Sequence, residues 1–248
     1  LTIPLAMAQD AAEAKQWLSP ELRQVSEQLI TQAEQDDTAY RLVESLTTEV
    51  GARLAGSPAE ARARQWALAQ MQALGLSNPR IETFPVWHWE RGSETAEILE
   101  PFPQPLHITA MGHSVATGPQ GISAEVVRFA TLPDLQEASA EQVRGKIVFV
   151  DEHTIRAQDG AGYGMSVQQR SGAAAEAGRL GAVAALIRSV GTDSHRFPHT
   201  GVMRYPEGVT QVPAAALSAP DADQLGRALA RGPVRVRLVL NNQGGGRT

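Results

Sequence analysis

The chain runs Lys146-Ile-Val-Phe-Val150 and, after a polar interval, Val167-Gln-Gln-Arg-Ser-Gly-Ala-Ala-Ala-Glu-Ala-Gly-Arg-Leu180, followed by Val183-Ala-Ala-Leu-Ile187. The outer two segments are short apolar runs, which are typical of buried strands. The middle segment is longer and rich in small residues, which favours a helix, and Gly178 and Gly181 allow that helix to pack closely. These residues therefore predict a strand, a close-packed helix and a second strand in succession.

Two helices are expected near the start of the chain. Ser19-Pro20-Glu21 marks the beginning of the first, which lies within residues 11–35. Asp36-Asp37 caps the second helix, and Gly51 is well placed to end it.

A third helix has the clearest start in the sequence. In Ser57-Pro58-Ala59-Glu60, serine is the N-cap, proline takes the first helical position and glutamate completes a capping box. Gly75 follows the last expected helical residue, Leu74. The stripe that we expect this helix to bury consists of Ala63, Trp66, Ala67, Met71 and Leu74.

The remainder of the chain alternates short apolar runs with Gly/Pro turns, which indicates strands. The predicted strands are Arg80–Trp87, Glu94–Leu99, Leu106–Met111, Ala124–Phe129, Lys146–Val150, Val183–Ile187, Ala214–Leu217 and Val234–Leu240. The first two flank the turn Arg91-Gly92-Ser93 and form a predicted β-hairpin. A last helix is expected over Ala219–Ala230, starting at Ser218 or Asp221, and residues 243–248 are predicted to be a linker.

Length and charge limit the possible classes of protein. With 248 residues, the chain has room for one large or two modest domains. Its net charge of −5, without a basic stripe, argues against nucleic-acid binding. No segment approaches the roughly 20 apolar residues of a membrane span.

Residues 1–8 fit the end of a signal peptide. Ala6-Met7-Ala8 has the small-x-small pattern of a cleavage site and follows an apolar run. This interpretation predicts a periplasmic or secreted protein. An apolar chain start with no targeting role fits the same residues.

The sequence lacks the usual signatures of a metal site. It has no cysteine and six histidines, with no H-E-x-x-H helix and no H-x-D strand end. His195 and His199 have the i, i+4 spacing of two helical zinc ligands, but Pro198 between them disfavours a helix. We therefore expect two loop histidines and assign no catalytic residue and no metal ligand.

Gly112-His113-Ser114-Val115-Ala116 resembles the nucleophile elbow of serine hydrolases, in which a strained turn joins a strand to a helix. The following Thr117-Gly118-Pro119-Gln120-Gly121 cannot begin that helix. We expect a polar turn between strands, and a serine hydrolase that uses Ser114 is kept as an alternative.

Three further motifs have plain structural interpretations. Gly160-Ala-Gly-Tyr-Gly164 matches no phosphate-binding loop and is predicted to be mobile. Asp151 and Glu152 are adjacent at a strand end, so they face opposite sides, and we expect both to be solvated. Of Trp87 and Trp89, we expect one to pack inward and the other to cover a domain junction, and an aromatic ligand platform is kept as the alternative.

The order and spacing of several motifs resemble one known family. Gly51-Ala-Arg53-Leu-Ala-Gly56-Ser57 is similar to the opening of its catalytic domain, and residues 85–94 are similar to the segment that leads into an inserted domain. The segments similar to that inserted, protease-associated domain are Gly121–Val126, Arg144–Val148, Ala177–Ala182, and Pro198–Gly201 with Tyr205. Together, over roughly residues 20–242, they resemble the zinc metallopeptidases of the aminopeptidase and glutamate carboxypeptidase superfamily, within it the carboxypeptidase Q group.

This resemblance implies an α+β chain in two parts. Residues 9–100 would be N-terminal helices and a β-hairpin of an incomplete α/β catalytic domain. Residues 101–242 would be a β-rich protease-associated domain with flanking helices. Arg53 is expected to anchor its turn by hydrogen bonding to a carbonyl or carboxylate group.

The resemblance also implies a parent enzyme that is a zinc exopeptidase acting on small peptides. Two zinc ions held by His, Asp and Glu would polarise the peptide carbonyl, a bridging water would attack it, and a Glu would act as general base. In that family the ligands follow the protease-associated region, so they would lie beyond Thr248. We expect no zinc bound by this chain and no hydrolysis by it alone.

Our candidate for contact with peptides or partners is the loop that contains His199, Thr200, Gly201 and Tyr205. By resemblance, this part of the chain covers the catalytic cleft. The expected partners are the missing catalytic domain, small peptides and further copies of the chain, since a face prepared for an absent sheet would be apolar. The competing hypothesis is a stand-alone protease-associated module that binds without chemistry.

Overall fold

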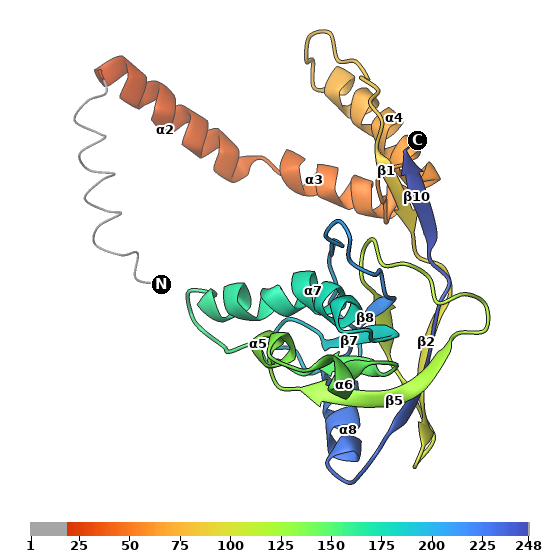
Figure 1. Cartoon of the computed structure of the whole chain (residues 1–248). Coiled ribbons are helices and arrows are strands. Elements are labelled where there is room, and N and C mark those ends of the chain that lie inside the picture. The colour runs from red at the N-terminus through yellow and green to blue at the C-terminus, as the bar shows by residue number, and fades with distance from the viewer. Residues whose placement is uncertain (1–18, 248) are drawn as a thin grey trace. The chain divides into compact units, whose positions relative to one another are not determined.

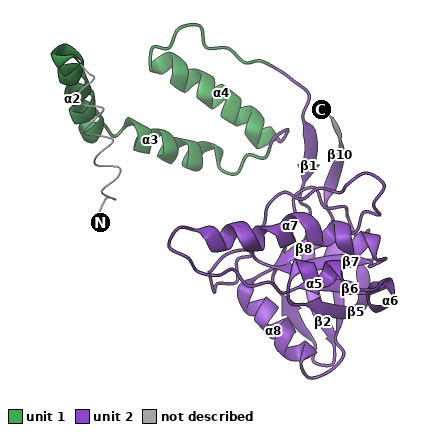
Figure 2. Cartoon of the chain, turned by 60° about the vertical axis from the view of Figure 1, so that its left-hand side comes forward, with its two compact units in different colours: residues 1–54, 58–82 green, residues 55–57, 83–248 purple. Residues whose placement is uncertain are grey.

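The computed structural model describes residues 19–247, so the predicted signal-peptide segment, residues 1–8, lies outside the described residues. The chain divides into two compact units, which Figure 2 shows in different colours. Unit 1 holds the residues up to Leu54 together with Pro58–Glu82, and unit 2 holds Ala55–Ser57 and everything from Thr83 onward. The predicted domain boundary at residue 100 falls inside unit 2.

Unit 1 is helical, as the sequence predicts. Its elements are α2 (Pro20–Gln35), α3 (Thr38–Ser45), the π-helical turn η1 (Leu46–Val50) and α4 (Pro58–Ala73). Ser19 caps α2 by accepting a hydrogen bond from the Leu22 amide at 3.3 Å. After η1, Gly51 adopts a φ of 72°, and the Arg53 guanidinium donates to the Gly51 carbonyl at 2.8 Å. The expected anchoring role of Arg53 is confirmed.

The apolar stripe of α4 is less buried than predicted. Trp66 is half-buried and its indole N–H donates to Ser45 Oγ at 2.8 Å. Met71 and Leu74, however, are 43% and 52% exposed. The prediction that both would be buried is wrong, because no described element of unit 1 lies over that end of the stripe.

Unit 2 is built on an eight-stranded sheet in the order β3-β2-β9-β5-β6-β7-β8-β4, beside a two-stranded sheet of β1 and β10. The strands are β1 (Trp87–Glu90), β2 (Glu94–Glu100), β3 (Gln104–Leu106), β4 (Ile108–Ala110), β5 (Ile122–Phe129), β6 (Ile147–Val150), β7 (Ala184–Arg188), β8 (Ala214–Leu217), β9 (Arg235–Leu240) and β10 (Gln243–Arg247). The strands β5 to β8 are mutually parallel, and the remaining pairs are antiparallel. The carboxyl ends of β5 to β8 therefore lie at one edge of the sheet.

Helices cover both faces of this sheet (Figure 1). They are α5 (Leu132–Gln136), α6 (Ala140–Val143), α7 (Ala161–Arg179) and α8 (Ala219–Leu229). The central strands alternate between two cores: Phe149 and Leu186 face the core shared with α8, whereas Val148 and Ile187 face the core shared with α7. The strand, helix and strand predicted from residues 146–187 are confirmed, and the overall class is α+β.

The predicted hairpin is not formed, because the two strands pair with distant partners. β1 pairs with β10 and β2 pairs with β9, both antiparallel. The interruption between β1 and β2 lies beside the interruption between β9 and β10. There the Asn241 amide donates to the Ser93 carbonyl at 3.0 Å. The tail, residues 243–248, predicted to be a linker, contains β10. Local alternation shows strand character but not the partner, so a pairing some 150 residues away was missed.

Two other predictions need correction. The glycine-rich run from Gly160 to Gly164, predicted to be a mobile loop, begins α7, with Gly160 as the N-cap in a left-handed conformation. The strand predicted over residues 106–111 is divided into β3 and β4 at His107, whose amide donates to the buried Asp221 carboxylate at 3.1 Å.

Candidate functional site

The candidate contact loop lies in the connection between β7 and β8, at the carboxyl edge of the parallel strands. Ser189 follows β7, and its hydroxyl accepts from the His199 amide at 2.9 Å while donating to the Leu217 carbonyl at 2.6 Å. Thr200 Oγ1 accepts from the Arg91 guanidinium at 3.1 Å. The first half of the loop is therefore held to two strand ends and to the β1–β2 connection.

The second half of the loop is held by backbone groups and by a tyrosine hydroxyl. The Gly201 carbonyl accepts from the Gly112 amide at 2.8 Å. Tyr205 donates its hydroxyl proton to the Val212 carbonyl at 2.6 Å and accepts from the Val115 amide at 3.3 Å. Burial raises the pKa of Tyr205, and the hydrogen bond from Val115 only partly offsets that effect. Tyr205 thus stays a neutral phenol near pH 7 and acts as an anchor.

Two sizeable cavities border this loop among the described residues, beside a much smaller one that His195, Phe197 and His199 help to line. The larger, which we call the tryptophan pocket, has a volume of about 670 Å³ and is lined by Trp87, Trp89, His113, Arg204, Tyr205 and Asn242, among others. The second, which we call the histidine cavity, has a volume of about 510 Å³ and is lined by Arg91, Asp193, His195, Phe197, His199 and Thr200, among others. The loop therefore brings Tyr205 to one cavity and His199 and Thr200 to the other. Gly201 lies between them in the chain and contacts the Gly112 turn.

Trp89 forms one wall of the tryptophan pocket and is held by contacts with Ser114 and Arg91. Trp89 is 7% exposed, its indole N–H donates to the Ser114 carbonyl at 2.9 Å, and the Arg91 guanidinium lies 5.1 Å from its ring centroid. Trp87 is 53% exposed. The prediction that one of the two indoles packs inward is confirmed for Trp89.

The Gly112–Ser114 turn forms another wall. The Ser114 amide donates to the Met111 carbonyl at 3.0 Å, and His113 has a φ of 71°. A left-handed conformation costs a non-glycine residue on the order of 1 kcal/mol. The turn is held by the pairing of Gly112 with the loop, which offsets this strain and keeps His113 in the pocket lining.

Ser114 is not a nucleophile in this geometry. It is 2% exposed, its hydroxyl donates to the Val115 carbonyl at 2.9 Å, and it accepts from the Ala214 amide at 2.8 Å. No helix follows it. The predicted polar turn between strands is confirmed, and the geometry of a nucleophile elbow is absent at Ser114.

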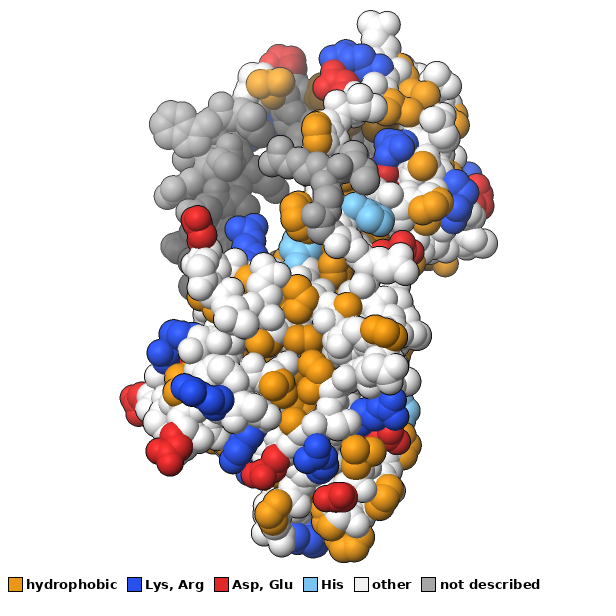
Figure 3. All heavy atoms as spheres, turned by 45° about the vertical axis from the view of Figure 1, so that its right-hand side comes forward, with side chains coloured by type: hydrophobic (Ala, Val, Ile, Leu, Met, Phe, Trp, Pro, Cys, Tyr) orange, Lys and Arg blue, Asp and Glu red, His pale blue; other side chains and the backbone are white. Residues whose placement is uncertain are grey.

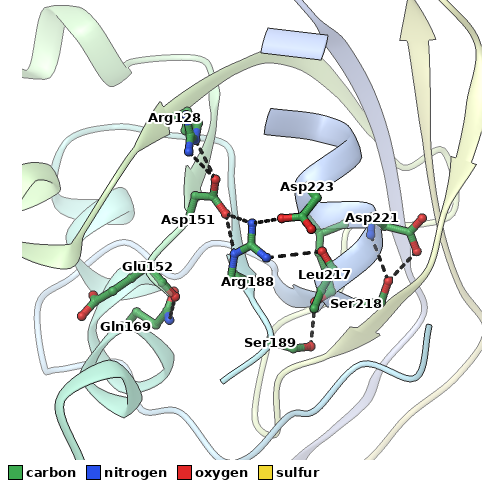
Figure 4. A network of polar contacts seen from close by, with 11 residues as sticks. Arg128, Asp151, Glu152, Gln169, Arg188, Ser189, Leu217, Ser218, Asp221 and Asp223 are labelled. Atoms are coloured by element: carbon green, nitrogen blue, oxygen red, sulfur yellow. Dashed lines mark hydrogen bonds and ion pairs between the residues drawn. The ribbon is translucent and has the colours of Figure 1, made fainter. Parts of the chain in front are cut away.

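A network of charged side chains lies at the carboxyl ends of β5, β6 and β7 (Figure 4). Asp151 is 3% exposed and accepts from the Arg128 and Arg188 guanidinium groups, each at 2.7 Å from Nε. Arg188 also pairs with Asp223 at 2.7 Å. The prediction that Asp151 is solvated is wrong, because the arginines that bury it come from other strands.

Glu152 faces away from this network, as the alternation of strand side chains predicts. Its carboxylate accepts from the Leu132 amide at 3.2 Å, and its carbonyl accepts from the Gln169 side chain at 2.9 Å. Asp151 and Glu152 therefore cannot act together on one substrate atom. Both belong to the scaffold that holds the strand ends.

The described residues do not fit a zinc pair. Within residues 19–247, no three His, Asp or Glu side chains lie close enough together to hold one metal ion. His195 Nε2 lies 3.6 Å from Asp193 Oδ2, and the His199 ring packs edge-on against Tyr163 with 6.3 Å between centroids. Both histidines lie in a loop, as predicted. No catalytic step is derived through zinc.

The surface of unit 2 mixes charge with apolar patches. Figure 3 shows apolar side chains gathered along the middle of one face of unit 2, with charged side chains around them. None of the helices between residues 19 and 247 has the length and apolar character of a membrane-spanning segment.

Curated proteins similar to this chain are carboxypeptidases. Carboxypeptidase Q of Mus musculus is 37% identical over 210 residues, which is 85% of this chain and 43% of that protein. Carboxypeptidase Q of Homo sapiens is 36% identical over 210 residues, 85% of this chain and 42% of that protein. The chain thus spans less than half the length of these relatives. A scan against protein-family models finds no match.

Solved structures agree with this similarity. A peptidase M28 precursor from Shewanella amazonensis SB2B is 49% identical, with a TM-score of 0.87 over 91% of this chain and 51% of that one. A zinc aminopeptidase from Bacillus subtilis, at 21% identity and a TM-score of 0.55 over 82% of this chain and 43% of that one, shares the fold.

The match to the Shewanella amazonensis protein, which covers 91% of this chain, includes residues of both units. The chain belongs to the zinc metallopeptidase superfamily that includes carboxypeptidase Q and the zinc aminopeptidases.

Sequence reasoning missed the arginines of the site. Arg91 and Arg204 line the two cavities, and Arg188 holds the strand end beneath the loop. For Arg91 a signal was present, since it lies two residues after the Trp87-His88-Trp89 run. For Arg204 and Arg188 only the fold shows where they lie.

Proposed function

We propose that this chain is the N-terminal part of a periplasmic or secreted zinc exopeptidase that hydrolyses small peptides. In this proposal unit 2 is the protease-associated domain, which shapes access to a catalytic centre formed elsewhere in the longer protein. The main support is the match to carboxypeptidase Q, which extends over 85% of this chain but only 43% of the relative. The 248-residue chain alone does not hydrolyse peptides in this proposal.

The partner is the part of the enzyme that carries the two zinc ions. Support comes from the apolar side chains of unit 1, which lie on the surface. Those more than 50% exposed include Leu22, Leu29, Ile30, Tyr40, Val43 and Leu74. A monomeric soluble domain rarely leaves so many large apolar side chains together on helices, so we assign this surface to packing against that partner or against a second copy.

A complementation experiment tests the proposal. The purified chain is assayed for bound zinc by mass spectrometry and for dipeptide hydrolysis, and we expect neither. The half of the Shewanella amazonensis peptidase M28 precursor outside the match is then added. We expect hydrolysis that appears only in the mixture and is abolished by a chelator.

Other outcomes have distinct meanings. Stoichiometric zinc with turnover by the chain alone overturns the proposal. Peptide binding by the chain, without activity in the mixture, supports a stand-alone protease-associated module instead. Labelling by a fluorophosphonate probe that is lost in Ser114→Ala would indicate the serine hydrolase, which the buried hydroxyl argues against.

A further inference from the structure

The tryptophan pocket has a chemical character that the overall similarity does not explain. Its volume of about 670 Å³ is within the range of small-molecule sites. Trp87 offers an exposed indole face, and Trp89 and Met203 add buried apolar surface. The pocket can therefore hold an apolar or aromatic side chain of a ligand.

The charge of the lining has one sign. Arg204 is exposed and has no hydrogen-bond or ion-pair partner among the described residues. His113 adds an imidazole to the lining, and none of the described residues that line the pocket is Asp or Glu. An unpaired guanidinium beside apolar walls favours a carboxylate, which it can bind through two parallel hydrogen bonds.

The lining also contains an incomplete hydrogen-bond set. Asn242 donates its amide N–H to the Ser114 carbonyl at 3.3 Å, while its Oδ1 is buried without a donor among the described residues. Unsatisfied buried acceptors are rare in folded proteins and call for an explanation. The strained φ of His113, 71°, is a second feature that clusters at binding sites.

We propose that the tryptophan pocket binds the C-terminal residue of a small peptide that ends in an apolar or aromatic side chain. The ring or aliphatic chain packs on Trp87, and the terminal carboxylate pairs with Arg204. This inference deepens the proposed function, on which it rests for the peptide nature of the ligand. It concerns binding only, so it is tested without zinc and without turnover.

The experiment is a titration of the 248-residue chain with N-acetyl-L-phenylalanine, followed by the indole N–H signals in NMR spectra. A Trp87→Phe variant assigns the Trp87 signal. We expect the Trp87 signal to shift with a dissociation constant of about 0.1–1 mM, as befits so small a ligand. The Trp66 signal, from unit 1, serves as an internal control and does not move.

Two changes isolate the carboxylate contact. N-acetyl-L-phenylalaninamide lacks the charge, and Arg204→Gln lacks its partner; each weakens binding by about tenfold, and the two together weaken it no further. Arg237→Gln is the matched control, since Arg237 is an exposed arginine on β9 outside the pocket lining. It leaves the affinity unchanged.

Equal affinity for the acid and the amide overturns the inference, as does an unchanged affinity in Arg204→Gln or no shift of Trp87 at 10-fold the expected dissociation constant. Failure of the complementation experiment together with carboxylate-dependent binding would refute the proposed enzyme and leave this site in place. Activity in the complementation experiment without carboxylate-dependent binding would refute this site and leave the proposed enzyme in place.

Discussion

Replacing Gly178 with alanine tests the packing that holds the candidate loop in place. Gly178 lies in α7, and a Cβ added there would come within 2.0 Å of the Thr210 carbonyl oxygen, whereas ordinary contact begins near 3.4 Å. The helix and the segment before β8 would have to separate by about 1.4 Å, the difference between those two values. The clash is with backbone, so no side-chain rotation relieves it.

The expected loss of stability combines two opposing terms. Overpacking costs about 1–3 kcal/mol, and a clash with backbone belongs to the upper part of this range, about 2–3 kcal/mol. The better helix propensity of alanine returns about 0.5–1 kcal/mol. We therefore expect Gly178→Ala to lower the free energy of unfolding by about 1–2 kcal/mol. Because Thr210 lies between Tyr205 and Val212, the variant should also weaken binding in the tryptophan pocket.

Gly164→Ala is the matched control in the same helix. An added Cβ there meets no atom within 4 Å. Only the propensity term remains, and we expect a gain of about 0.5–1 kcal/mol. Urea denaturation followed by circular dichroism and by indole fluorescence measures both variants. Equal effects of the two substitutions, or a neutral Gly178→Ala, would refute the close approach of α7 to the loop.

Three further predictions concern the scaffold and the surface. Asp151→Asn should lower the free energy of unfolding by about 2–4 kcal/mol, because two arginines lose a buried charge partner. Asp193→Asn is the control, since that carboxylate is 63% exposed, and it should change the free energy by less than about 0.5 kcal/mol in the same urea experiment. Tyr205→Phe should cost about 1–2 kcal/mol at pH 7. The pKa of Tyr205 is raised in the folded state, so the wild type should lose stability as the pH rises above about 10. The variant should lack this part of the loss. Unfolding compared at pH 8 and pH 11 measures the difference. The purified chain should self-associate in sedimentation velocity. Leu29→Glu, which replaces an apolar side chain 60% exposed with a charged one, should shift the chain toward monomer. A monodisperse wild-type monomer that binds no hydrophobic dye would contradict this prediction.

The elements that sequence patterns predicted well are those whose signals are local. Ser218 was named as a start of the last helix, and α8 begins at the next residue with the Ser218 hydroxyl capping the Asp221 amide. The apolar run of residues 214–217 was predicted as a strand with the bounds that β8 has. Both depend on residues within a few positions of each other.

The elements that were mispredicted depend on distant partners. Residues 243–247 look like a linker because three glycines have little strand propensity, yet β1 supplies the hydrogen bonds that make them a strand. Gly160 to Gly164 looked like a loop for the same reason. There Gly162 is required, because a Cβ would come within 1.8 Å of the Ile155 carbonyl oxygen, so a tertiary contact accounts for the glycine within a helix.

The site was predictable only in part. The sequence predicted a contact loop at His199, Thr200, Gly201 and Tyr205, and the structure places these residues in the connection between β7 and β8; their contact with a ligand stays a prediction. An aromatic ligand platform at Trp87 and Trp89 was considered from the sequence, but the polar part of the tryptophan pocket was not foreseen. Its His113, Arg204 and Asn242 are up to 155 positions from Trp87 and meet it only through the pairing of β1 with β10 and of Gly112 with the loop. Sequence distance conceals such a site even when each residue is conspicuous alone.

The anchoring of the loop decides how it can take part in recognition. Between His199 and Tyr205 it is tied to Ser189, Arg91, Gly112 and Val212 by hydrogen bonds of 2.6–3.1 Å. A segment tied at so many points loses little conformational entropy when a ligand binds, so its affinity does not depend on ordering. If unit 2 shapes access to a catalytic centre, it does so as a preformed surface, and any opening or closing must come from movement of the whole unit. The Met203 amide donates to the Gly112 carbonyl at 3.0 Å, and its hydrogen exchange distinguishes a rigid loop from a loop that opens by itself. Protection equal to that of the β7 amides supports the rigid surface, and exchange as fast as that of the exposed helix α2 would mean that the loop itself opens.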